Sequence, residues 1–438
     1  MLGSITMWAA DWKDTSYWLD DMPQVSGVSS DLKRKVDVLI IGSGYTGLNA
    51  ALEIARGGRD VMVIESGYPG YGCSTRNGGQ ISTHVKPSLE KLTQKVGASR
   101  ASAMRQEGVN ALDWIEELVN KEKLDCNFLR AGRFHAAHSS DQYDGLARDA
   151  EKLTKFENIP TEIVPKAEQH TELGTDMYYG GVVFPRHASV HPAKYHHGLL
   201  SRVSEAGATV VSYCEAKAVN KLEKGFEVRT SKGDVVCQDL VVATNGYTTT
   251  ITPWLRRRVI PIGSYIIATE PIEKSLMDKL FPTNRNITDT CKVVYYYRPS
   301  PDRKRILFGG RVSAKETNTA TSGPKLHNDL VRVFPELSDI KVTHSWFGTV
   351  AYTFDELAHT GCHDGIYYSM GYCGSGVSMA SYLGMRLGQK VLGLSQGETA
   401  FDDLPFPTKP LYTGNPWFLP PIVSWYRWRD KRQIINAR

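Results

Sequence analysis

A glycine turn near the start of the chain has the residue types and spacing that can hold a dinucleotide. Residues 42–47 (Gly-Ser-Gly-Tyr-Thr-Gly) follow an apolar run over 36–41, and a second apolar run ends at Glu65. Glycines let the backbone turn sharply beside a pyrophosphate, whose charge is met by the N–H groups at a helix N-terminus. The Glu65 carboxylate can accept hydrogen bonds from ribose hydroxyls. The pattern therefore predicts a strand, a phosphate-binding turn, a helix over 48–55 and a dinucleotide site.

Two more glycine turns follow much later in the chain. An expected strand over 240–243 leads into Thr244, Asn245 and Gly246, where the backbone can approach a ligand. Another expected strand, 365–371, leads into a glycine turn and an expected helix over 378–392. A helix N-terminus at that turn stabilises the negative charge that the pyrimidine edge of a flavin gains on reduction. A nicotinamide has no such need, so the three turns together favour FAD.

The composition argues against several other classes of protein. The 438 residues are 41% hydrophobic and 23% charged, which is ordinary for a soluble enzyme, and the net charge of +5 predicts no nucleic-acid binding. The seven cysteines contain no CxxC pair, so neither a metal site nor a disulfide framework is expected. His191, His196 and His197 are expected to serve helix-terminal structure. Free thiols, the lack of an apolar leader and the lack of a run of about 18 apolar residues predict a cytoplasmic protein.

The expected elements predict an α/β protein with two domains. Short strands dominate residues 208–243, and four antiparallel strands are expected between residues 264 and 350. We expect a Rossmann-like FAD-binding domain and a second, substrate domain built on a mainly antiparallel sheet. The first is assigned residues 31–90, 190–250 and 355–395, and the second is assigned residues 91–189 and 251–354.

The two ends of the chain are expected to lie outside these domains. Residues 1–30 show little periodicity and are interpreted as a leader, and residues 396–438 are interpreted as a C-terminal extension. The extension combines aromatic residues with arginines over 417–429. That composition predicts either packing against the body of the protein or peripheral contact with a membrane surface.

Five ordered motifs resemble the D-amino-acid oxidase superfamily of FAD enzymes. Within it, the chain is most similar to the γ-glutamylputrescine oxidase branch, and the resemblance runs from about residue 10 to the C-terminus. The motifs are residues 42–47 with Glu65, the loop 74–80 (Ser-Thr-Arg-Asn-Gly-Gly-Gln), and residues 243–246, 346–361 and 371–377.

The resemblance implies which residues hold FAD. The first glycine turn would hold the pyrophosphate, Glu65 the ribose, Val219 the adenine through its main chain, and the last turn the pyrimidine edge. The residues expected to contact FAD are Gly42, Ser43, Gly44, Tyr45, Thr46, Gly47, Glu65, Ser66, Ser74, Thr75, Arg76, Asn77, Gly78, Gly79, Gln80, Val219, Thr244, Asn245, Gly246, Gly374, Ser375, Gly376 and Val377.

Three positions depart from the sarcosine oxidase branch of that superfamily. Val350 stands where that branch attaches its flavin to a cysteine, so we expect non-covalent FAD. Ser378 stands where that branch has a lysine for the substrate carboxylate, which argues against a simple N-methyl amino acid. Leu307 stands where it has an oxygen-activating lysine, so the electron acceptor is left open between O2 and a membrane acceptor.

Flavin-dependent amine oxidation needs a neutral amine held against the flavin, and an apolar aromatic pocket favours that form. Candidate pocket residues are Tyr265, Tyr296, Arg298, Arg311, Trp346 and Tyr372. The aromatic residues are expected to line the pocket or to pack in the core. The arginines are expected to pair with a substrate carboxylate or to form surface ion pairs.

Three functions are considered on this basis. The first is the FAD-dependent oxidation of a secondary amine or an N-substituted aminoalkyl compound such as γ-glutamylputrescine, in amine or polyamine catabolism. The second is an amino-acid oxidase or deaminase that passes electrons to the respiratory chain. The third is a flavin-binding protein without catalysis.

Overall fold

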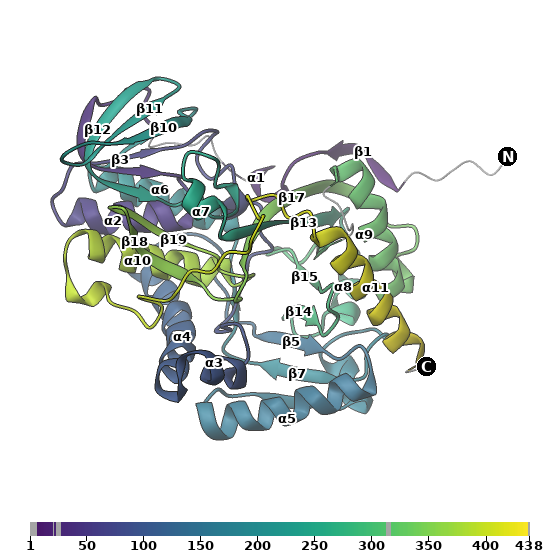
Figure 1. The fold of residues 1–438 in the computed structure, drawn as a ribbon. Helices are drawn as coiled ribbons and strands as arrows, with labels where there is room; N and C mark the ends of the chain where they lie inside the picture. Colours follow the sequence, from purple (N-terminus) through teal and green to yellow (C-terminus); the bar gives the residue numbers. More distant parts are fainter. Residues whose placement is uncertain (1–6, 21, 23–27, 312–316, 437–438) are drawn as a thin grey trace.

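Two sheets and the helices that cover them make up the protein in this computed structural model, which describes residues 7–20, 22, 28–311 and 317–436 (Figure 1). The chain passes between the two sheets several times, and each sheet collects strands from distant parts of the sequence. The predicted α/β class, with a Rossmann-like unit and a second, mainly antiparallel sheet, is confirmed.

The eight-stranded sheet contains five neighbouring parallel strands, in the order β9 (Thr209–Val211), β3 (Val61–Ile64), β2 (Lys35–Ile41), β12 (Gly233–Val242) and β19 (Ile366–Met370). Antiparallel strands β10 (Ala216–Lys221), β11 (Phe226–Thr230) and β18 (His359–His363) extend it. The parallel strands are continuous apolar runs because both of their faces are buried. In β2, Val38 and Ile40 join one hydrophobic cluster, and Leu39 and Ile41 join another.

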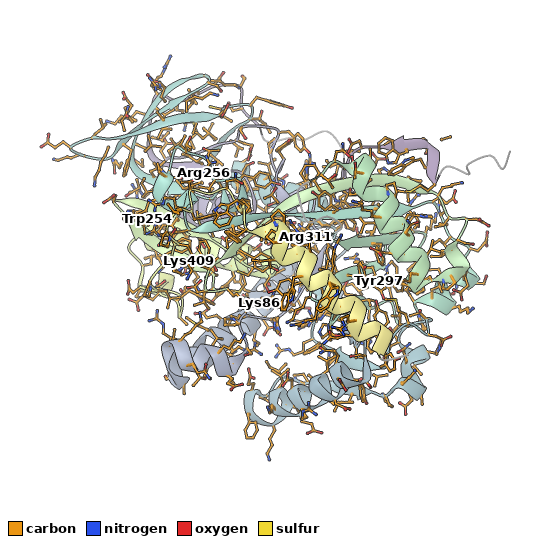
Figure 2. All side chains as sticks on the ribbon, turned by 45° about the vertical axis from the view of Figure 1, so that its right-hand side comes forward. Lys86, Trp254, Arg256, Tyr297, Arg311 and Lys409 are labelled. Carbon is orange, nitrogen blue, oxygen red and sulfur yellow. The ribbon has the colours of Figure 1, made fainter. Side chains whose placement is uncertain are left out.

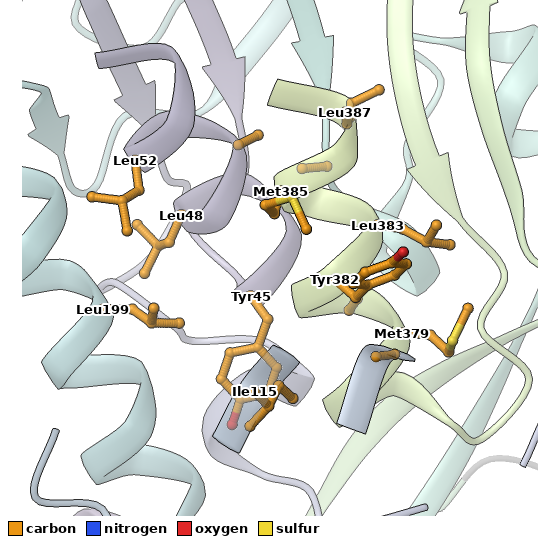
Figure 3. Packing of buried hydrophobic residues seen from close by; sticks show 14 of the residues in the cluster. Tyr45, Leu48, Leu52, Ile115, Leu199, Met379, Tyr382, Leu383, Met385 and Leu387 are labelled. Atoms are coloured by element: carbon orange, nitrogen blue, oxygen red, sulfur yellow. The ribbon is translucent and has the colours of Figure 1, made fainter. Parts of the chain in front are cut away.

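Helices α2 (Tyr45–Arg56) and α10 (Gly376–Val391) lie side by side on one face of this sheet (Figure 3). Glycines allow the close approach: a Cβ atom at Gly384 would lie 2.5 Å from the carbonyl oxygen of Thr46, and a Cβ atom at Gly388 would lie 2.9 Å from that of Ala50. Leu48, Tyr382 and other side chains then interdigitate around the contact. The two helices are therefore fixed relative to each other along their length.

The nine-stranded sheet has the order β1 (Trp8–Lys13), β17 (Val342–Thr353), β13 (Val259–Thr269), β16 (Ile306–Gly310), β15 (Tyr295–Pro299), β14 (Asn286–Asp289), β5 (Arg133–Ala136), β7 (Gly181–Phe184) and β6 (Glu162–Val164). Its pairs are antiparallel except β1 with β17 and β14 with β5. Helix α9 (Thr319–Val333) packs on one face and closes a second hydrophobic core.

The remaining elements surround the two sheets (Figure 1). The short strands β4 (Gln80–Ile81) and β8 (Ala188–Ser189) pair with each other. The further helices are α1 (Tyr17–Asp20), α3 (Leu89–Val96), α4 (Ala98–Lys121), α5 (Ser140–Glu157), α6 (Pro192–Glu205), α7 (Pro253–Arg256), α8 (Lys274–Leu280) and α11 (Leu419–Asn436).

The N-terminal segment differs from the expected leader. Strand β1 pairs with β17, and Trp18 is fully buried between the two sheets with Ala193 and Trp346. Residues 8–20 are therefore part of the folded body. The sequence pattern missed this because a single edge strand and one buried indole carry no periodicity.

The C-terminal extension ends in helix α11, which packs against the loop between β14 and β15. The Asp430 carboxylate accepts hydrogen bonds from the main-chain N–H groups of Lys292 (3.1 Å) and Val293 (3.0 Å). Arg427 Nη2 donates to the Arg311 carbonyl oxygen at 2.8 Å, and Figure 2 shows Arg311 beside the upper end of the helix. Of the two expected alternatives, the structure shows packing against the body. Within the described residues, none of the helices combines the length and apolar composition that a membrane crossing requires.

Candidate functional site

The three glycine turns predicted from the sequence lie together at one edge of the parallel sheet. Strands β2 and β19 flank β12 and run parallel to it, with Val242 paired to both Ile41 and Tyr368. The segments that follow these strands must therefore emerge side by side. Gly371 N–H donates to the side-chain oxygen of Asn245 at 2.9 Å, which joins two of the turns directly.

The first turn needs its glycines for steric reasons. Gly42 has φ +106°, and a Cβ atom there would lie 3.0 Å from the carbonyl oxygen of Ala243. A Cβ atom at Gly47 would lie only 1.9 Å from the carbonyl oxygen of Gly42, and one at Gly44 would lie 2.9 Å from Ser74 Oγ. The backbone thus folds tightly under the first turn of α2, whose N–H groups have no acceptor inside the helix and can face a phosphate.

Glu65 lies at the end of β3 beside this turn, as expected. Its Oε2 atom accepts hydrogen bonds from Ser43 N–H (3.0 Å) and Ser43 Oγ (2.9 Å), and its Oε1 atom accepts one from Ser66 Oγ (3.1 Å). The carboxylate is half-buried and carries several lone pairs. Gly67 N–H also donates to Oε1 at 3.3 Å, so ribose hydroxyls would bind here by replacing the rotatable hydroxyls of Ser43 and Ser66.

His196 also contacts the first glycine turn, a role that the sequence did not predict. Its Nε2 atom lies 2.7 Å from the Ser43 carbonyl oxygen. Burial lowers the pKa of His196 to about 4, so the imidazole is neutral at pH 7 and donates this hydrogen bond. The neighbouring His191 accepts from Lys194 N–H at the start of α6, in agreement with its expected helix-terminal role.

Main-chain contacts join the end of β3 to the residues before β10, beside the residue expected to bind the ribose. Cys214 N–H donates to the Glu65 carbonyl oxygen at 2.7 Å, and Tyr213 N–H donates to that of Gly67 at 2.9 Å. Val219, the residue expected to contact adenine, lies further along β10 and pairs with Val228. Tyr213 and Cys214 therefore bond directly to the segment at Glu65, whereas Val219 does not.

The loop 74–80 lies between the two sheets and is held by indole N–H groups. Trp18 Nε1 donates to the Asn77 carbonyl oxygen at 2.8 Å, and Trp346 Nε1 donates to that of Arg76 at 2.9 Å. The Asn77 side-chain oxygen accepts from Gly79 N–H at 2.8 Å. The sequence did not predict the role of Trp18, because the glycine motif does not indicate which distant residue holds the loop.

The other loop residues make local or inter-sheet contacts. Ser74 Oγ accepts from Tyr45 N–H at 3.0 Å, and Thr75 Oγ1 donates to the Gly70 carbonyl oxygen at 2.8 Å. Gln80 Nε2 donates to the Tyr297 carbonyl oxygen at 3.3 Å. The loop therefore connects the first turn of α2 to strand β15.

The last turn opens onto unfilled space at the first turn of α10. Gly374 has φ +99°, and a Cβ atom built at Gly376 meets no heavy atom within 4 Å. Ser375 Oγ donates to the His84 carbonyl oxygen (2.7 Å), and Ser378 Oγ donates to that of Ser82 (3.0 Å). The segment 82–86 thus runs along the start of α10, while Val377 is buried in the core below.

Lys86 is a cation near this turn that sequence reasoning did not single out. Its Nζ atom lies 3.2 Å from Tyr352 Oη, and a Cβ atom at Gly374 would lie 3.6 Å from that hydroxyl. Its sequence signal was weak because a single lysine outside the glycine motifs has no distinguishing pattern.

The nine-stranded sheet turns one face toward the loop 74–80, and Tyr296 and Trp346 lie on that face. Neighbouring residues across the sheet follow the order Trp346, Ile266, Gly309, Tyr296, Thr288 and His135. Residues paired in this way point to the same side. A Cβ atom at Gly78 would lie 3.0 Å from the Tyr296 ring, whose hydroxyl is 2.7 Å from Ser264 Oγ.

Tyr265 and Tyr372 do not lie on that face. Tyr265 is fully buried in the core beneath α9, and its hydroxyl accepts from Thr317 N–H at 2.8 Å. Tyr372 is buried between α2 and α10, where its hydroxyl contacts Thr46 Oγ1 and the Ser369 carbonyl oxygen. Side chains alternate between the two faces of β13, so Tyr265 points into the core while Ile266 lies on the face that looks toward the loop 74–80. We therefore leave both tyrosines out of the proposed pocket.

The two candidate arginines bind main-chain carbonyl groups. Buried Arg298 donates through Nη1 to the carbonyl oxygens of Gly79 (3.0 Å) and Val190 (3.2 Å), so it clamps the loop 74–80. Arg311 donates to the Gly263 carbonyl oxygen at 3.2 Å. These contacts assign Arg298 a positioning role.

Comparison with known proteins identifies the family. The model of the family described as "DAO: FAD dependent oxidoreductase" matches residues 37–390. The chain belongs to this family. It is 28% identical to the gamma-glutamylputrescine oxidoreductase of Escherichia coli over 84% of this chain and 86% of that protein. It is 29% identical to the probable oxidoreductase OrdL of Haemophilus influenzae over 85% of this chain and 86% of that protein.

Solved structures share the fold of this DAO family chain. Glycine oxidase from Geobacillus kaustophilus aligns with a TM-score of 0.71 at 18% identity, over 86% of this chain and 99% of that one. L-proline dehydrogenase from P. horikoshii aligns with a TM-score of 0.69 at 18% identity, over 91% and 99%. The predictions of the family, of an oxidoreductase and of FAD as its cofactor are confirmed.

Proposed function

We propose that this enzyme oxidises the C–N bond of an amine to an imine, which water then converts to an aldehyde and an amine or ammonia. The proposed substrate is a secondary amine or an N-substituted aminoalkyl compound such as γ-glutamylputrescine. The observation that carries this proposal is the uncharged face of the nine-stranded sheet that looks toward the loop 74–80, where the partly exposed Tyr296 ring lies in one row with buried Ile266 and Trp346. The relative named gamma-glutamylputrescine oxidoreductase supports it.

The residues of the turns fit FAD as a ligand. The tight backbone at Gly42 and Gly47 would admit the pyrophosphate, Glu65 would accept the ribose hydroxyls, and the open space at Gly376 would admit the pyrimidine edge. When bound, FAD supplies the acceptor for the two electrons and the hydrogen removed from the amine carbon. We propose that it binds without a covalent link, since Val350 has no nucleophilic side chain.

The protein's part in the reaction is to select and position the neutral amine. An apolar site disfavours the ammonium form because desolvation raises the free energy of the charge. Tyr296 provides a ring face that can contact the substrate's methylene groups or a residual cation, and Trp346 is buried beside it against Trp18. The Trp346 and Arg298 hydrogen bonds to the loop 74–80 keep this aromatic face at a fixed distance from the cofactor site.

An amino-acid oxidase or deaminase is the second candidate, and Lys86 is the observation that favours it. This cation lies beside Tyr352 and near the turn at Gly374, where it could pair with an α-carboxylate. Arg298 and Arg311 give this alternative less support, because the hydrogen bonds described above go to carbonyl oxygens.

Anaerobic mixing of the purified holoenzyme with amines and amino acids tests the proposal. We expect γ-glutamylputrescine and related N-substituted aminoalkyl compounds to bleach the visible absorption of the flavin, while simple α-amino acids do not. Bleaching by amino acids alone would replace the proposal with the second candidate. Bleaching by neither class would leave a flavin-binding protein. Hydrogen peroxide release in air then identifies an oxidase, and bleaching without peroxide identifies a dehydrogenase with another acceptor.

A further inference from the structure

Arg133 differs from the arginines around it because it has no polar partner in the part of the chain that the structure describes. Its neighbour Arg130 donates to Glu116 at 2.7 Å, and Arg285 donates to Glu172 at 2.6 Å. The Nε atom of Arg133 is buried without a hydrogen bond. A guanidinium with five donors and no acceptor is costly inside a protein unless a ligand supplies the missing anion.

The guanidinium is held by an aromatic ring on the same face of the sheet as the proposed amine pocket. Its central carbon lies 4.9 Å from the centre of the Phe184 ring. Phe134 and Ala136, which alternate with Arg133 along β5, are buried in the core on the opposite face. Arg133 and His135 therefore point together toward the side of the sheet that carries Tyr296.

Three imidazoles lie near this guanidinium. His135 lies on the same face of β5, and the His187 ring stacks on Phe184 with 5.0 Å between ring centres. His84 follows Thr83, whose N–H donates to His187 Nε2 at 3.3 Å. Burial, followed by the positive charge of Arg133, lowers the pKa of His135 to about 3 and holds that of His187 well below its usual range. Burial also lowers the pKa of His84, and the charges of Arg105 and Arg133 add to the effect. The imidazoles are therefore neutral at pH 7, and each can donate one hydrogen bond to an anion.

His84 and His135 also keep some exposed surface. Both lie deep enough for burial to dominate their pKa, yet neither is fully buried, and the same holds for Arg133. The His84 side chain makes no hydrogen bond to the described residues, and its carbonyl oxygen accepts from Ser375 Oγ at the start of α10.

Strand β14 joins this group of residues to the proposed amine pocket. His135 Nδ1 lies 2.9 Å from Thr288 Oγ1, and Thr288 is paired with Tyr296 across β14 and β15. Arg133 lies two residues before His135 in β5 and therefore on the same face of the sheet. A molecule with its amine at Tyr296 would thus extend past Thr288 and His135 before it reached the guanidinium.

We propose that Arg133, with His84 and His135, binds a carboxylate at the end of the substrate remote from the amine that is oxidised. This inference rests on the proposed amine oxidation and names the substrate class more closely: an aminoalkyl compound with a terminal carboxylate. Arginine binds a carboxylate through two parallel N–H···O hydrogen bonds, which supplies both the anion and the orientation.

Two amines that differ only at the far end test this subsite. N-succinylputrescine ends in a carboxylate, and N-butyrylputrescine replaces it with a methyl group at nearly the same length. We expect wild-type holoenzyme to show half-saturation of anaerobic flavin reduction at a concentration about 10- to 100-fold lower for the succinyl compound. Arg133→Met should raise the half-saturating concentration of the succinyl compound and leave that of the butyryl compound unchanged, which removes the preference.

Arg186→Gln is the matched control, because Arg186 is a neighbouring arginine that already pairs with Asp113 at 2.7 Å. We expect this variant to keep the wild-type preference. Equal half-saturation of the wild type by both amines would overturn the subsite. The subsite would also be overturned if Arg133→Met, with normal flavin content, raised the half-saturating concentrations of both amines equally. That result would make Arg133 a structural residue.

A non-reactive ligand separates this inference from the proposed function. N-butylsuccinamic acid carries the carboxylate and lacks the amine, and its binding to holoenzyme can be measured by calorimetry. If this ligand binds the wild type and Arg133→Met binds it more weakly, the subsite is supported. If at the same time no amine bleaches the flavin, only the proposed function fails. Absence of binding to the wild type, or equal binding to the variant, counts against the subsite.

Discussion

The hydroxyl groups of Thr46 and Tyr372 lie 2.7 Å apart, although 326 positions separate them in the sequence. Thr46 belongs to the first turn of α2, and Tyr372 precedes the first turn of α10. The Tyr372 hydroxyl also donates to the Ser369 carbonyl oxygen at 2.8 Å. This contact fixes the spacing of the two helix N-termini that would hold the middle and the flavin end of one FAD molecule.

Tyr372→Phe should therefore lower both the stability and the cofactor affinity. Loss of a buried hydroxyl that serves two partners should reduce the free energy of unfolding by about 1–2 kcal/mol. Urea unfolding and FAD titration of the apoprotein measure the two effects. Tyr143→Phe on α5 is the control, because the Tyr143 hydroxyl makes no hydrogen bond to described residues.

Gly376→Ala should weaken FAD binding without destabilising the apoprotein. A Cβ atom at Gly376 meets no protein atom within 4 Å, so only a ligand in front of α10 would meet it. We expect FAD affinity to fall about 10- to 100-fold, as for overpacking of a tight site. Gly145→Ala on α5, where a Cβ atom also has open space, should stabilise the protein by roughly 0.5–1 kcal/mol and leave FAD affinity unchanged. Equal FAD affinities for Gly376→Ala and the wild type would contradict the placement.

Glu65→Ala should weaken FAD retention because it removes the carboxylate that would accept the ribose hydroxyls. The loss of hydrogen bonds to a charged group predicts an affinity about 10- to 100-fold lower. Flavin content after exhaustive dialysis is the measurement. Unchanged occupancy would refute the role assigned to Glu65. Glu223→Ala, in the turn between β10 and β11, should behave as the wild type.

Acid precipitation should release all of the flavin into the supernatant. Val350 lies in β17 opposite Ile262 and offers no atom for a covalent bond to the cofactor. The absorption spectra of supernatant and pellet check this directly. Yellow colour that stays with the pellet would show a covalent link at another residue.

Stability should decrease below about pH 6.5, where histidines begin to bind protons in the unfolded chain. The folded-state pKa of His196 is lowered to about 4, so its contribution is present above about pH 6.5 and is lost as the pH falls toward about 4. Between about pH 7 and pH 5, this one group should cost about 2 kcal/mol. His196→Gln can still donate to the Ser43 carbonyl oxygen and does not titrate, so urea unfolding should show a smaller loss over this range. An identical pH dependence would contradict the assignment.

Local patterns predicted the glycine turns that the structure brings together at one edge of the parallel sheet. The turn at Gly42, the carboxylate at Glu65 and the turn at Gly376 could be found because each follows an apolar strand and precedes a helix, and that order limits how the backbone can run. The substrate half was less accessible. Tyr265 and Tyr296 occupy similar-looking strands, yet only the register across β13, β16 and β15 decides which of them faces the cofactor site.

The sequence by itself determined the fold class, the family and the identity of the cofactor, because glycine turns and strand periodicity act over a few residues. Only the tertiary structure decided that Trp18 anchors the loop 74–80, that Arg298 binds carbonyl oxygens, and that Arg133 stands without a partner. These outcomes depend on which side chains meet across distant strands. A burial pattern or a spacing rule does not contain that information, because pairing between segments is set by the packing of the whole chain.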